Sequence, residues 1–343
     1  MKRVGFLDDP VFGEHDAGPG HPERPERLDA VRRGLREGGI QGHLVALPPR
    51  PATREELLRV HLAGHIDRLA AADGTSVRLD PDTAMGPRSW AAATRAAGAV
   101  VDAVDKVLDG VLDRAFCSVR PPGHHATPRR AMGFCLLNNV ALGAAAALAR
   151  GLERVAVIDF DVHHGNGTQE TFWRDRRVLY VSSHRSPFYP GTGDLDEVGE
   201  GEGRGFTVNL PMPAGLGDGE YRRAYREIVE PIGRAFDPEL VLVSAGFDAH
   251  RHDPLGGMAL SAAGFAELMD VCLVVASGAA RGRLVAVLEG GYDLDGIAEA
   301  SAAVLGRMLG RAFDAPTAAT RSEFDALLEA FRTAHGKYWP AVK

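Results

Sequence analysis

The sequence predicts an α/β fold in which buried parallel strands alternate with crossover helices. Short apolar runs without a two-residue alternation occur at 115–119, 155–158, 178–181, 240–243 and 284–288. Strands that are buried on both faces of a sheet have this pattern, and helical segments separate most of the runs. Hydrophobic residues make up 45% of the 343 residues, which is enough for a large core. Because no internal repeat, linker or low-complexity segment interrupts the chain, we expect a single domain over residues 1–343.

The N-terminal third is expected to contribute one strand and two long helices before the first of these runs. Residues 4–7 are predicted to form the strand. Residues 18–25 follow as a loop rich in Gly and Pro. Helices are predicted at 27–37, where a Gly-Gly pair ends the pattern, and at 89–108.

Thr53 is predicted to cap a further helix, because Glu56 stands three residues later as the partner of a capping box. His61 and His65 follow one turn apart on that helix, but no carboxylate pattern that would complete a metal site surrounds them. We interpret both as surface or packing histidines.

Helical patterns also fill the second half of the chain. Three of them lie between apolar runs, at 138–149, 219–232 and 262–276, and are predicted to connect one parallel strand to another. Two more are predicted after the last run, at 294–309 and 322–334.

Charge and cysteine content argue against several classes of protein. The net charge of −7 and the pI near 6.0 argue against a nucleic-acid binder that relies on phosphate neutralisation. The three cysteines, Cys117, Cys135 and Cys272, form no CxxC pair and indicate a reducing compartment. The first ten residues become acidic too soon for a signal peptide, and no apolar stretch has membrane-spanning length. We therefore expect a soluble, cytoplasmic protein without a nucleic-acid or membrane partner.

The stretch 155–168 carries the first chemical signal. Asp159, Asp161 and His163 alternate at the end of a buried apolar run, so in extended backbone they point to one side. Because unpaired buried charge is costly, a divalent metal is the expected partner. We predict that Asp161 and His163 bind zinc and that Asp159 is a supporting carboxylate. The alternative interpretation is a polar strand end in which Asp and His hydrogen-bond to each other.

Three other apolar runs also end in unusual polar residues. The segments are Arg120-Pro-Pro-Gly-His-His-Ala126, Ser244-Ala-Gly-Phe-Asp-Ala-His250 and Glu289-Gly-Gly-Tyr-Asp293. Sites in open parallel sheets form outside the carboxyl ends of the strands, so we expect all four segments to converge on one crevice. Each segment alone is also compatible with an ordinary loop or turn.

Together, these segments predict a catalytic zinc site. Asp248 completes an Asp2His ligand set, and three protein ligands leave one position open, as catalytic zinc sites do. An ion held in this way acidifies water and polarises a carbonyl group. His124 and His125 supply imidazoles for general base and general acid catalysis. Tyr292 can donate a hydrogen bond to a developing oxyanion.

Asp159 and Asn166 are the expected partners of the histidine pair. A carboxylate favours a charged imidazolium, whereas an amide leaves its partner more nearly neutral. The two imidazoles are therefore expected to differ in charge.

Aromatic residues near the strand ends predict a narrow channel. They come from Gly133-Phe134 and from Pro187-Phe-Tyr-Pro-Gly-Thr-Gly193. Facing rings would form a slot suited to an extended aliphatic chain. Plain core packing of the same rings is the alternative.

These motifs resemble the zinc-dependent histone deacetylase superfamily, which includes bacterial amidohydrolase and acetylpolyamine members. The resemblance runs from His21-Pro-Glu-Arg-Pro-Glu-Arg-Leu28 to about Leu309. Its motifs stand in the family order: Arg120-Pro-Pro-Gly-His-His125, Gly133-Phe-Cys135, Asp159-Phe-Asp-Val-His-His-Gly165, Gly246-Phe-Asp248 and Glu289-Gly-Gly-Tyr292. The resemblance implies an arginase/deacetylase-like three-layer α/β fold, with a mostly parallel eight-stranded sheet and helices on both faces.

The resemblance also implies roles for the polar residues. One zinc ion per chain would bind Asp161, His163 and Asp248. His125 would act as general base and acid with His124 as its electrostatic partner, and Tyr292 would polarise the carbonyl group. Asn166, where other members have Asp, resembles the class II branch. Potassium would bind through backbone carbonyls around Asp159, Asp161, His163, Ser182 and His184.

Substrate contacts are implied in the same way. The Gly133 carbonyl would accept the substrate amide proton. Phe134 and Tyr189 would wall the acyl channel, with Tyr189 standing where the family has phenylalanine. Asp82, with Asp80 as the alternative, would hold the substrate backbone at the rim.

The activity that the resemblance implies is removal of an acetyl or similar acyl group from an amine. We predict N-ε-acyl-lysine in proteins or peptides as the substrate, because lysine-selective members have leucine and polyamine-selective members an acidic residue where Leu255 stands. The alternative is an acetylpolyamine amidohydrolase or another small-molecule deacetylase. An arginase-like binuclear manganese hydrolase would need more bridging aspartates, and a catalytically inactive acyl-lysine binder would not need Tyr292. Assembly into a homo-oligomer stays open.

Overall fold

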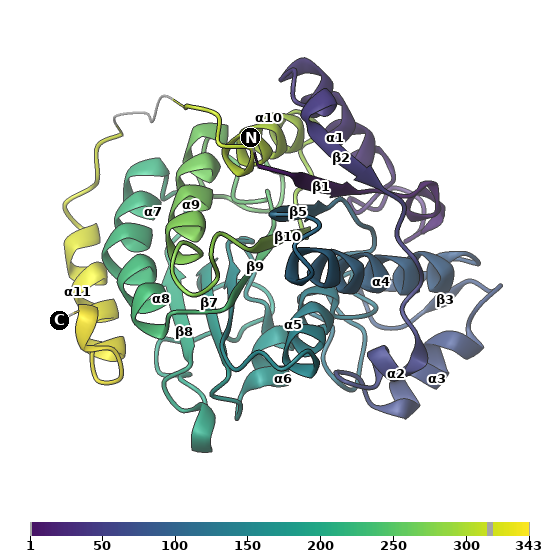
Figure 1. The fold of residues 1–343 in the computed structure, drawn as a ribbon, viewed down its shortest axis with the longest axis horizontal. Coiled ribbons are helices and arrows are strands. Elements are labelled where there is room, and N and C mark those ends of the chain that lie inside the picture. The colour runs from purple at the N-terminus through teal and green to yellow at the C-terminus, as the bar shows by residue number, and fades with distance from the viewer. Residues whose placement is uncertain (1, 314–317, 343) are drawn as a thin grey trace.

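The apolar runs form the centre of a parallel sheet that lies between two layers of helices (Figure 1). The structure is a computed structural model that describes residues 2–313 and 318–342. Within these residues the sheet contains eight strands in the order β2-β1-β5-β10-β9-β6-β7-β8, and every neighbouring pair is parallel. The strands are β1 (Val4–Leu7), β2 (Leu44–Leu47), β5 (Arg114–Cys117), β6 (Val155–Asp159), β7 (Val178–Arg185), β8 (Thr207–Met212), β9 (Leu240–Ala245) and β10 (Leu284–Leu288).

Each face of the sheet is covered by its own set of helices (Figure 1). One layer contains α1 (Glu26–Glu37), α7 (Asp218–Ala224), α8 (Glu230–Phe236), α9 (Ala262–Val275) and α10 (Leu294–Met308). The other contains α4 (Ser89–Leu108), α5 (Asn139–Ala149) and α6 (Asn166–Phe172). This arrangement confirms the predicted three-layer α/β fold.

Smaller elements extend the two ends of this core. The short helices α2 (Arg54–Leu57) and α3 (Ala63–Ala71) lie near the antiparallel pair of β3 (Val77–Arg78) and β4 (Ala84–Met85). Helix α11 (Phe324–His335) lies beside α7, where Arg223 and Asp325 form an ion pair.

The helix predicted at 219–232 is divided into three parts. A π-helical turn, Tyr225–Val229, separates α7 from α8. Pro231 follows this turn, and because proline has no N–H to donate, a regular α-helical ladder cannot continue through it.

Two strands of the eight-stranded sheet were not predicted from the sequence, and both lie at its edges. In β2 the two middle residues are exposed, so the segment lacks the buried apolar pattern of the central strands. Pro211 interrupts the pattern of β8 and is tolerated there because an edge strand leaves one row of N–H groups unpaired.

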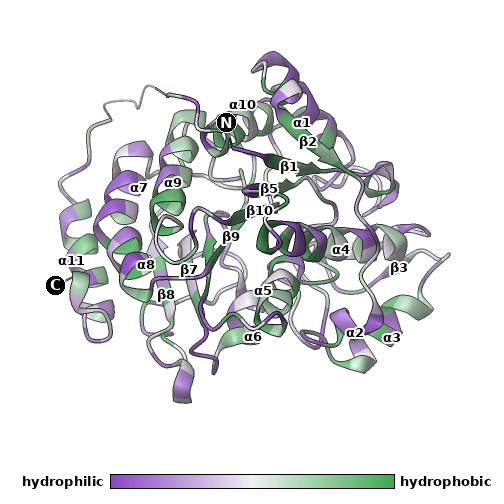
Figure 2. Ribbon diagram, viewed as in Figure 1, coloured by the Kyte–Doolittle hydropathy of each residue, from purple (hydrophilic) through white to green (hydrophobic). Residues whose placement is uncertain are grey.

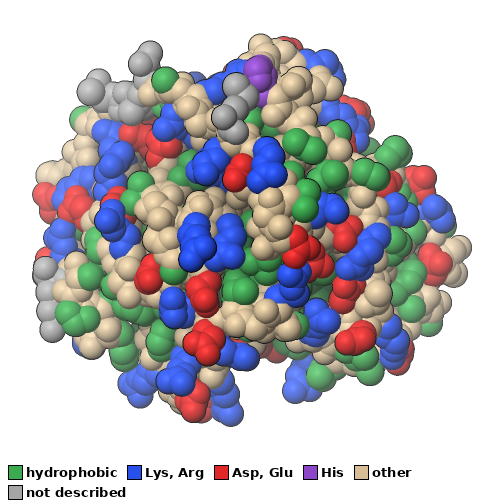
Figure 3. All heavy atoms as spheres, in the orientation of Figure 1, with side chains coloured by type: hydrophobic (Ala, Val, Ile, Leu, Met, Phe, Trp, Pro, Cys, Tyr) green, Lys and Arg blue, Asp and Glu red, His purple; other side chains and the backbone are tan. Residues whose placement is uncertain are grey.

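The central strands supply most of the core. All residues of β6, β9 and β10 are buried. Figure 2 shows that the strands are predominantly hydrophobic, whereas α1 and α7 alternate hydrophobic and hydrophilic residues. Acidic and basic side chains are interspersed over the face shown in Figure 3. Among the described residues, no helix combines the length and apolarity needed to cross a bilayer.

The histidines near α2 are packing residues. The capping box forms as predicted, with Glu56 N donating to Thr53 Oγ1 at 3.2 Å. His61 lies in the turn after α2, and His65 lies in α3 rather than on one helix with it. Both are buried, and their rings bond to the backbone of Thr127 and Leu136. These two hydrogen bonds therefore anchor the backbone on both sides of Gly133-Phe134.

Candidate active site

The four strands that end in polar residues are neighbours in the middle of the sheet. Their order is β5-β10-β9-β6, although the chain visits them in a different order. Asp159 pairs with Ser244, and Leu288 pairs with Ala245, so these strands end at one level. Because all four run parallel, their carboxyl ends lie at one edge of the sheet. The predicted convergence is therefore present.

Asp161, His163 and Asp248 form a compact set of metal donors. Nδ1 of His163 lies 3.1 Å from Asp161 Oδ1 and 3.1 Å from Asp248 Oδ2. Both carboxylates are fully buried. Burial would lower the pKa of His163, but the two carboxylates raise it to about 10. Burial and the neighbouring Asp161 raise the pKa of the Asp248 carboxyl to about 7, so a cation beside this pair of carboxylates would stabilise their charged form.

The backbone around these carboxylates also fits a metal centre. A Cβ at Gly246 would lie 2.0 Å from Asp161 Oδ2, and a Cβ at Gly290 would lie 2.1 Å from Asp248 Oδ2. Glycine is therefore required at both positions to leave the carboxylates in place. One imidazole and two carboxylates, with donor atoms within 4.8 Å of one another, match the ligand chemistry of zinc.

The two histidines of the pair have different partners and different charges. Their rings are 4.0 Å apart. Nδ1 of His124 lies 3.0 Å from Asp159 Oδ2, whereas Nδ1 of His125 lies 2.9 Å from Asn166 Oδ1. Burial opposes protonation of His124, but Asp161 and Asp159 raise its pKa to about 10. Burial and the neighbouring charge on His124 lower the pKa of His125 well below its ordinary value.

Two residues behind the histidine pair have supporting contacts that the sequence analysis left unassigned. Tyr180 donates its hydroxyl to Asp159 Oδ2 at 3.2 Å. Glu289 Oε2 accepts from the backbone N–H groups of Gly123 at 2.6 Å and His124 at 3.1 Å. Burial raises the pKa of Glu289 to about 7. Glu289 directly follows a buried strand, and this position in the sequence could have indicated a role at the site.

The turn that carries Tyr292 is held from two sides. Asp253 Oδ2 accepts from the backbone N–H of Tyr292 at 2.6 Å. Arg27 donates to the carbonyl oxygens of Glu289 and Gly291, and its guanidinium lies 5.2 Å from the centre of the Tyr292 ring. Burial keeps the pKa of Tyr292 well above its ordinary value although Arg27 opposes the shift, so the hydroxyl stays protonated.

Arg27 belongs to a buried ionic network whose roles were not assigned from sequence. Its Nη1 donates to Glu23 Oε1 at 2.9 Å, and Arg120 donates to both Glu23 oxygens at 2.5 and 2.7 Å. Burial opposes ionisation, but Arg120 and His15 hold the pKa of the Glu23 carboxyl well below its usual range. Glu23 and Arg24 give the loop at 18–25 charged residues that could have indicated an ionic network, but only the fold shows that this network supports the Tyr292 turn.

A channel of about 190 Å³ leads to these groups. Its walls include Phe134, Phe188 and Tyr189, together with His125 and His163. The predicted aromatic residues therefore line the channel, including Phe188 of the loop at 187–193, whose ring stacks on His163 at 5.1 Å. Tyr189 packs edge-on against His125 at 5.1 Å.

The Gly133-Phe134 turn that forms one wall has unusual backbone geometry. Both residues have positive φ, of 57° and 68°. A Cβ on Gly133 would lie 2.4 Å from His125 Cδ2, so only glycine fits beside the ring. Phe134 has a conformation that side chains rarely adopt, and such conformations are concentrated at functional sites.

The predicted rim residues also border the channel. Leu255 and Asp82 line it, whereas Asp80 is not among its lining residues. Asp82 Oδ1 accepts from Gly133 N at 3.3 Å, which joins the rim to the channel wall. The remaining predicted potassium residues, Ser182 and His184, are buried on β7, and Ser182 pairs with Asp159 of β6.

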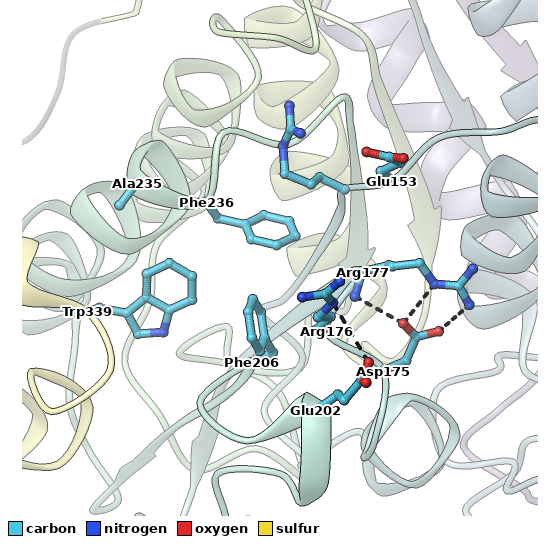
Figure 4. Close-up of a pocket in the computed structure, with 10 residues that line it drawn as sticks. Glu153, Asp175, Arg176, Arg177, Glu202, Phe206, Ala235, Phe236 and Trp339 are labelled. Carbon is cyan, nitrogen blue, oxygen red and sulfur yellow. Dashed lines mark hydrogen bonds and ion pairs between the residues drawn. The ribbon is translucent and has the colours of Figure 1, made fainter.

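A second cavity, of about 570 Å³, lies at the other end of the strands and has different chemistry (Figure 4). Four of its charged residues form two ion pairs, Arg177 with Asp175 and Arg176 with Glu202. The rings of Phe206, Phe236 and Trp339 pack edge-to-face at one side. None of the polar residues at the carboxyl ends of the strands lines this cavity, so the narrower channel is the candidate active site.

Comparisons with known proteins agree with the geometry. Residues 21–308 match the family model of the histone deacetylase domain. A "Probable deacetylase" of Archaeoglobus fulgidus is 40% identical over 99% of this chain and 99% of its own length. A "Histone deacetylase-like amidohydrolase" of Pseudomonas aeruginosa is 41% identical over 85% of this chain and 82% of its length.

Solved structures support the same relationship. A crystal structure of the HDA15 HD domain superposes with a TM-score of 0.93 at 38% identity, covering 99% of this chain and 98% of that one. This chain spans about half the length of the matched Arabidopsis thaliana histone deacetylases 15 and 5. The chain therefore belongs to the histone deacetylase family of amide hydrolases, in which zinc dependence is a family trait.

Proposed function

We propose that this protein hydrolyses the amide bond of N-ε-acyl-lysine in peptides or proteins, with one zinc ion bound to Asp161, His163 and Asp248. The observation that supports this most directly is the narrow channel, which is lined by aromatic rings and leads to the metal donors and the histidine pair. An acyl-lysine side chain is a long aliphatic chain with the reacting amide at its far end. The channel can therefore enclose the chain while the amide reaches the donors.

Each remaining polar group has a part in the proposed reaction. Zinc, when bound, would supply Lewis-acid polarisation of the carbonyl and would make water more acidic. His125 is neutral, so it can accept a proton from the attacking water and then donate it to the leaving amine. His124 stays charged and favours the negative charge that develops nearby. Tyr292 donates a hydrogen bond to the oxyanion.

Substrate contacts follow from the same arrangement. The Gly133 carbonyl oxygen accepts a hydrogen bond from the Cys135 thiol at 3.2 Å. Its second lone pair can accept the substrate amide proton. Asp82 at the rim would accept from the substrate backbone. We also propose that the backbone carbonyls around Asp159, Asp161, His163, Ser182 and His184 hold a structural potassium ion, and that residues 1–343 act as one domain.

A substrate screen tests the proposed function. Turnover of acetyl- and longer acyl-lysine peptides is to be compared with turnover of acetylated polyamines at equal concentration. We expect higher kcat/KM for the peptides. Hydrolysis of acetylpolyamines with no measurable turnover of any acyl-lysine peptide would replace the proposal by the polyamine alternative.

Leu255→Glu should narrow or reverse the preference for acyl-lysine. A carboxylate at the channel mouth would attract the distal ammonium of an acetylated polyamine, and a tenfold change in relative kcat/KM corresponds to about 1.4 kcal/mol. The measurement is kcat/KM for one acetyl-lysine peptide and one acetylpolyamine.

Leu255→Gln is the matched control, because it has the size of glutamate without the charge. It should leave the preference near that of the unmodified protein. Equal shifts in both variants would show that charge at this position does not set the preference.

Arg27→Lys should lower kcat more than it raises KM. Lysine keeps the charge beside Glu23 but cannot bridge the two carbonyls of the Tyr292 turn, and small displacements of a catalytic group can cost about 10²-fold in rate. Steady-state kinetics separates the two parameters.

Arg33→Lys on the same helix is the control, because Arg33 pairs with Asp295 at the surface. Unchanged kcat in Arg27→Lys would refute a positioning role for Arg27.

A further inference from the structure

A second set of metal donors lies on the two loops that carry Asp248 and Tyr292. His250 and His252 follow β9, and Asp293 follows β10. One donor atom from each residue lies within 4.8 Å of the others. None of these three residues lines the channel. The cluster therefore shares no metal donor with the candidate active site.

His250 is held firmly in this cluster. Its side chain is buried, with 1% of its surface exposed. A Cβ at Gly296 would lie 2.4 Å from His250 Nδ1, so the glycine makes room for the ring at the start of α10. Among the described residues, His250 Nε2 has no hydrogen-bond partner. The other ring nitrogen, Nδ1, has only a long contact of 3.5 Å with the backbone N–H of His252, so neither nitrogen of this buried ring has a strong partner, and a metal ion bound at one of them would stabilise the ring.

His252 and Asp293 complete the set of metal donors and leave one side of it accessible to solvent. His252 is exposed, and its ring packs edge-on against that of His250 at 5.3 Å. Asp293 uses Oδ1 to cap α10, accepting from Gly296 N at 2.9 Å, which leaves Oδ2 for a further ligand.

We propose that His250, His252 and Asp293 bind a second divalent transition-metal ion, of the Zn²⁺ or Ni²⁺ class. Two imidazoles and one carboxylate suit these ions, whereas Mg²⁺ and Ca²⁺ prefer oxygen ligands. Zinc–nitrogen bonds of about 2.0–2.1 Å place tetrahedral ligands roughly 3.3 Å apart. The donors need to close by only a small distance, and rotation of the exposed His252 side chain supplies it. Three protein ligands leave a position open to solvent.

Binding to this site can be measured without any assay of hydrolysis. Protein first loaded with one equivalent of Zn²⁺ is titrated with Ni²⁺ by equilibrium dialysis, and the sum of zinc and nickel per chain is determined by mass spectrometry. We expect the unmodified chain to bind a second equivalent. His252→Ala should bind it at least tenfold more weakly, and exposure of this side chain makes the substitution compatible with folding.

Two more variants sharpen the result. Asp293→Asn keeps a residue that caps helices well but removes the charge, and it should also weaken the second equivalent. His43→Ala removes an exposed histidine elsewhere and should bind like the unmodified chain. A total of one metal per chain at millimolar Ni²⁺, or equal affinity in His252→Ala, would overturn the proposal. Because the readout is a metal count, failure here would leave the proposed hydrolysis untouched.

Discussion

Replacement of Tyr292 by phenylalanine should reduce kcat by about 10²–10³-fold, the usual effect of removing one oxyanion donor. Substrate binding and metal content should change little, because the hydrogen bond reaches full strength only when the carbonyl becomes an oxyanion. The ring would keep its contacts, since Phe134 packs edge-on against it at 5.9 Å and Arg27 lies over it. Steady-state kinetics and metal analysis of the purified variant provide the measurement.

Tyr221→Phe is a matched control for this substitution. The Tyr221 hydroxyl is buried and has no hydrogen-bond partner among the described residues, and it does not line the channel. Its removal should leave turnover near normal. Near-normal turnover in Tyr292→Phe as well would refute the role of the Tyr292 hydroxyl.

The central strands and the approach of their polar ends could be predicted from sequence. Unalternating apolar runs mark strands buried on both faces, and parallel strands place their carboxyl ends at one edge. Asp159, Asp161 and His163 then follow from a local pattern. The order β5-β10-β9-β6 could not be predicted from these patterns, because no local pattern specifies which strands become neighbours.

Residues that act through distant contacts were harder to assign. Glu23, Arg27 and Arg120 are far apart in sequence from the Tyr292 turn, and their buried pairing appears only when α1 packs against α10. The sequence does not distinguish Phe188 from the other aromatic residues of the loops, because its stacking on His163 depends on the fold. The edge strands β2 and β8 were missed because exposure and proline remove the apolar pattern on which the predictions relied.

Asp248→Ala should abolish stable metal binding at the active site. Asp161 and His163 would remain, but two ligands do not replace three at a zinc site with one open position. The variant is best made together with His252→Ala, so that the second proposed site does not contribute to the count. Metal content after dialysis should fall from one per chain to nearly zero, and turnover should fall with it.

The control for this loss is a carboxylate of the same channel that is not a donor. Asp82→Asn, in the same background, should keep its metal, because Asp82 bonds to Gly133 N at the rim rather than to the donor set. Asp248 Oδ1 also accepts from Val162 N at 2.8 Å, so Asp248→Asn provides a version of similar shape that can keep this contact. Circular dichroism separates metal loss from unfolding. A folded Asp248 variant that retains one tightly bound metal per chain would show that the ligand assignment is wrong, and with it the proposed mechanism.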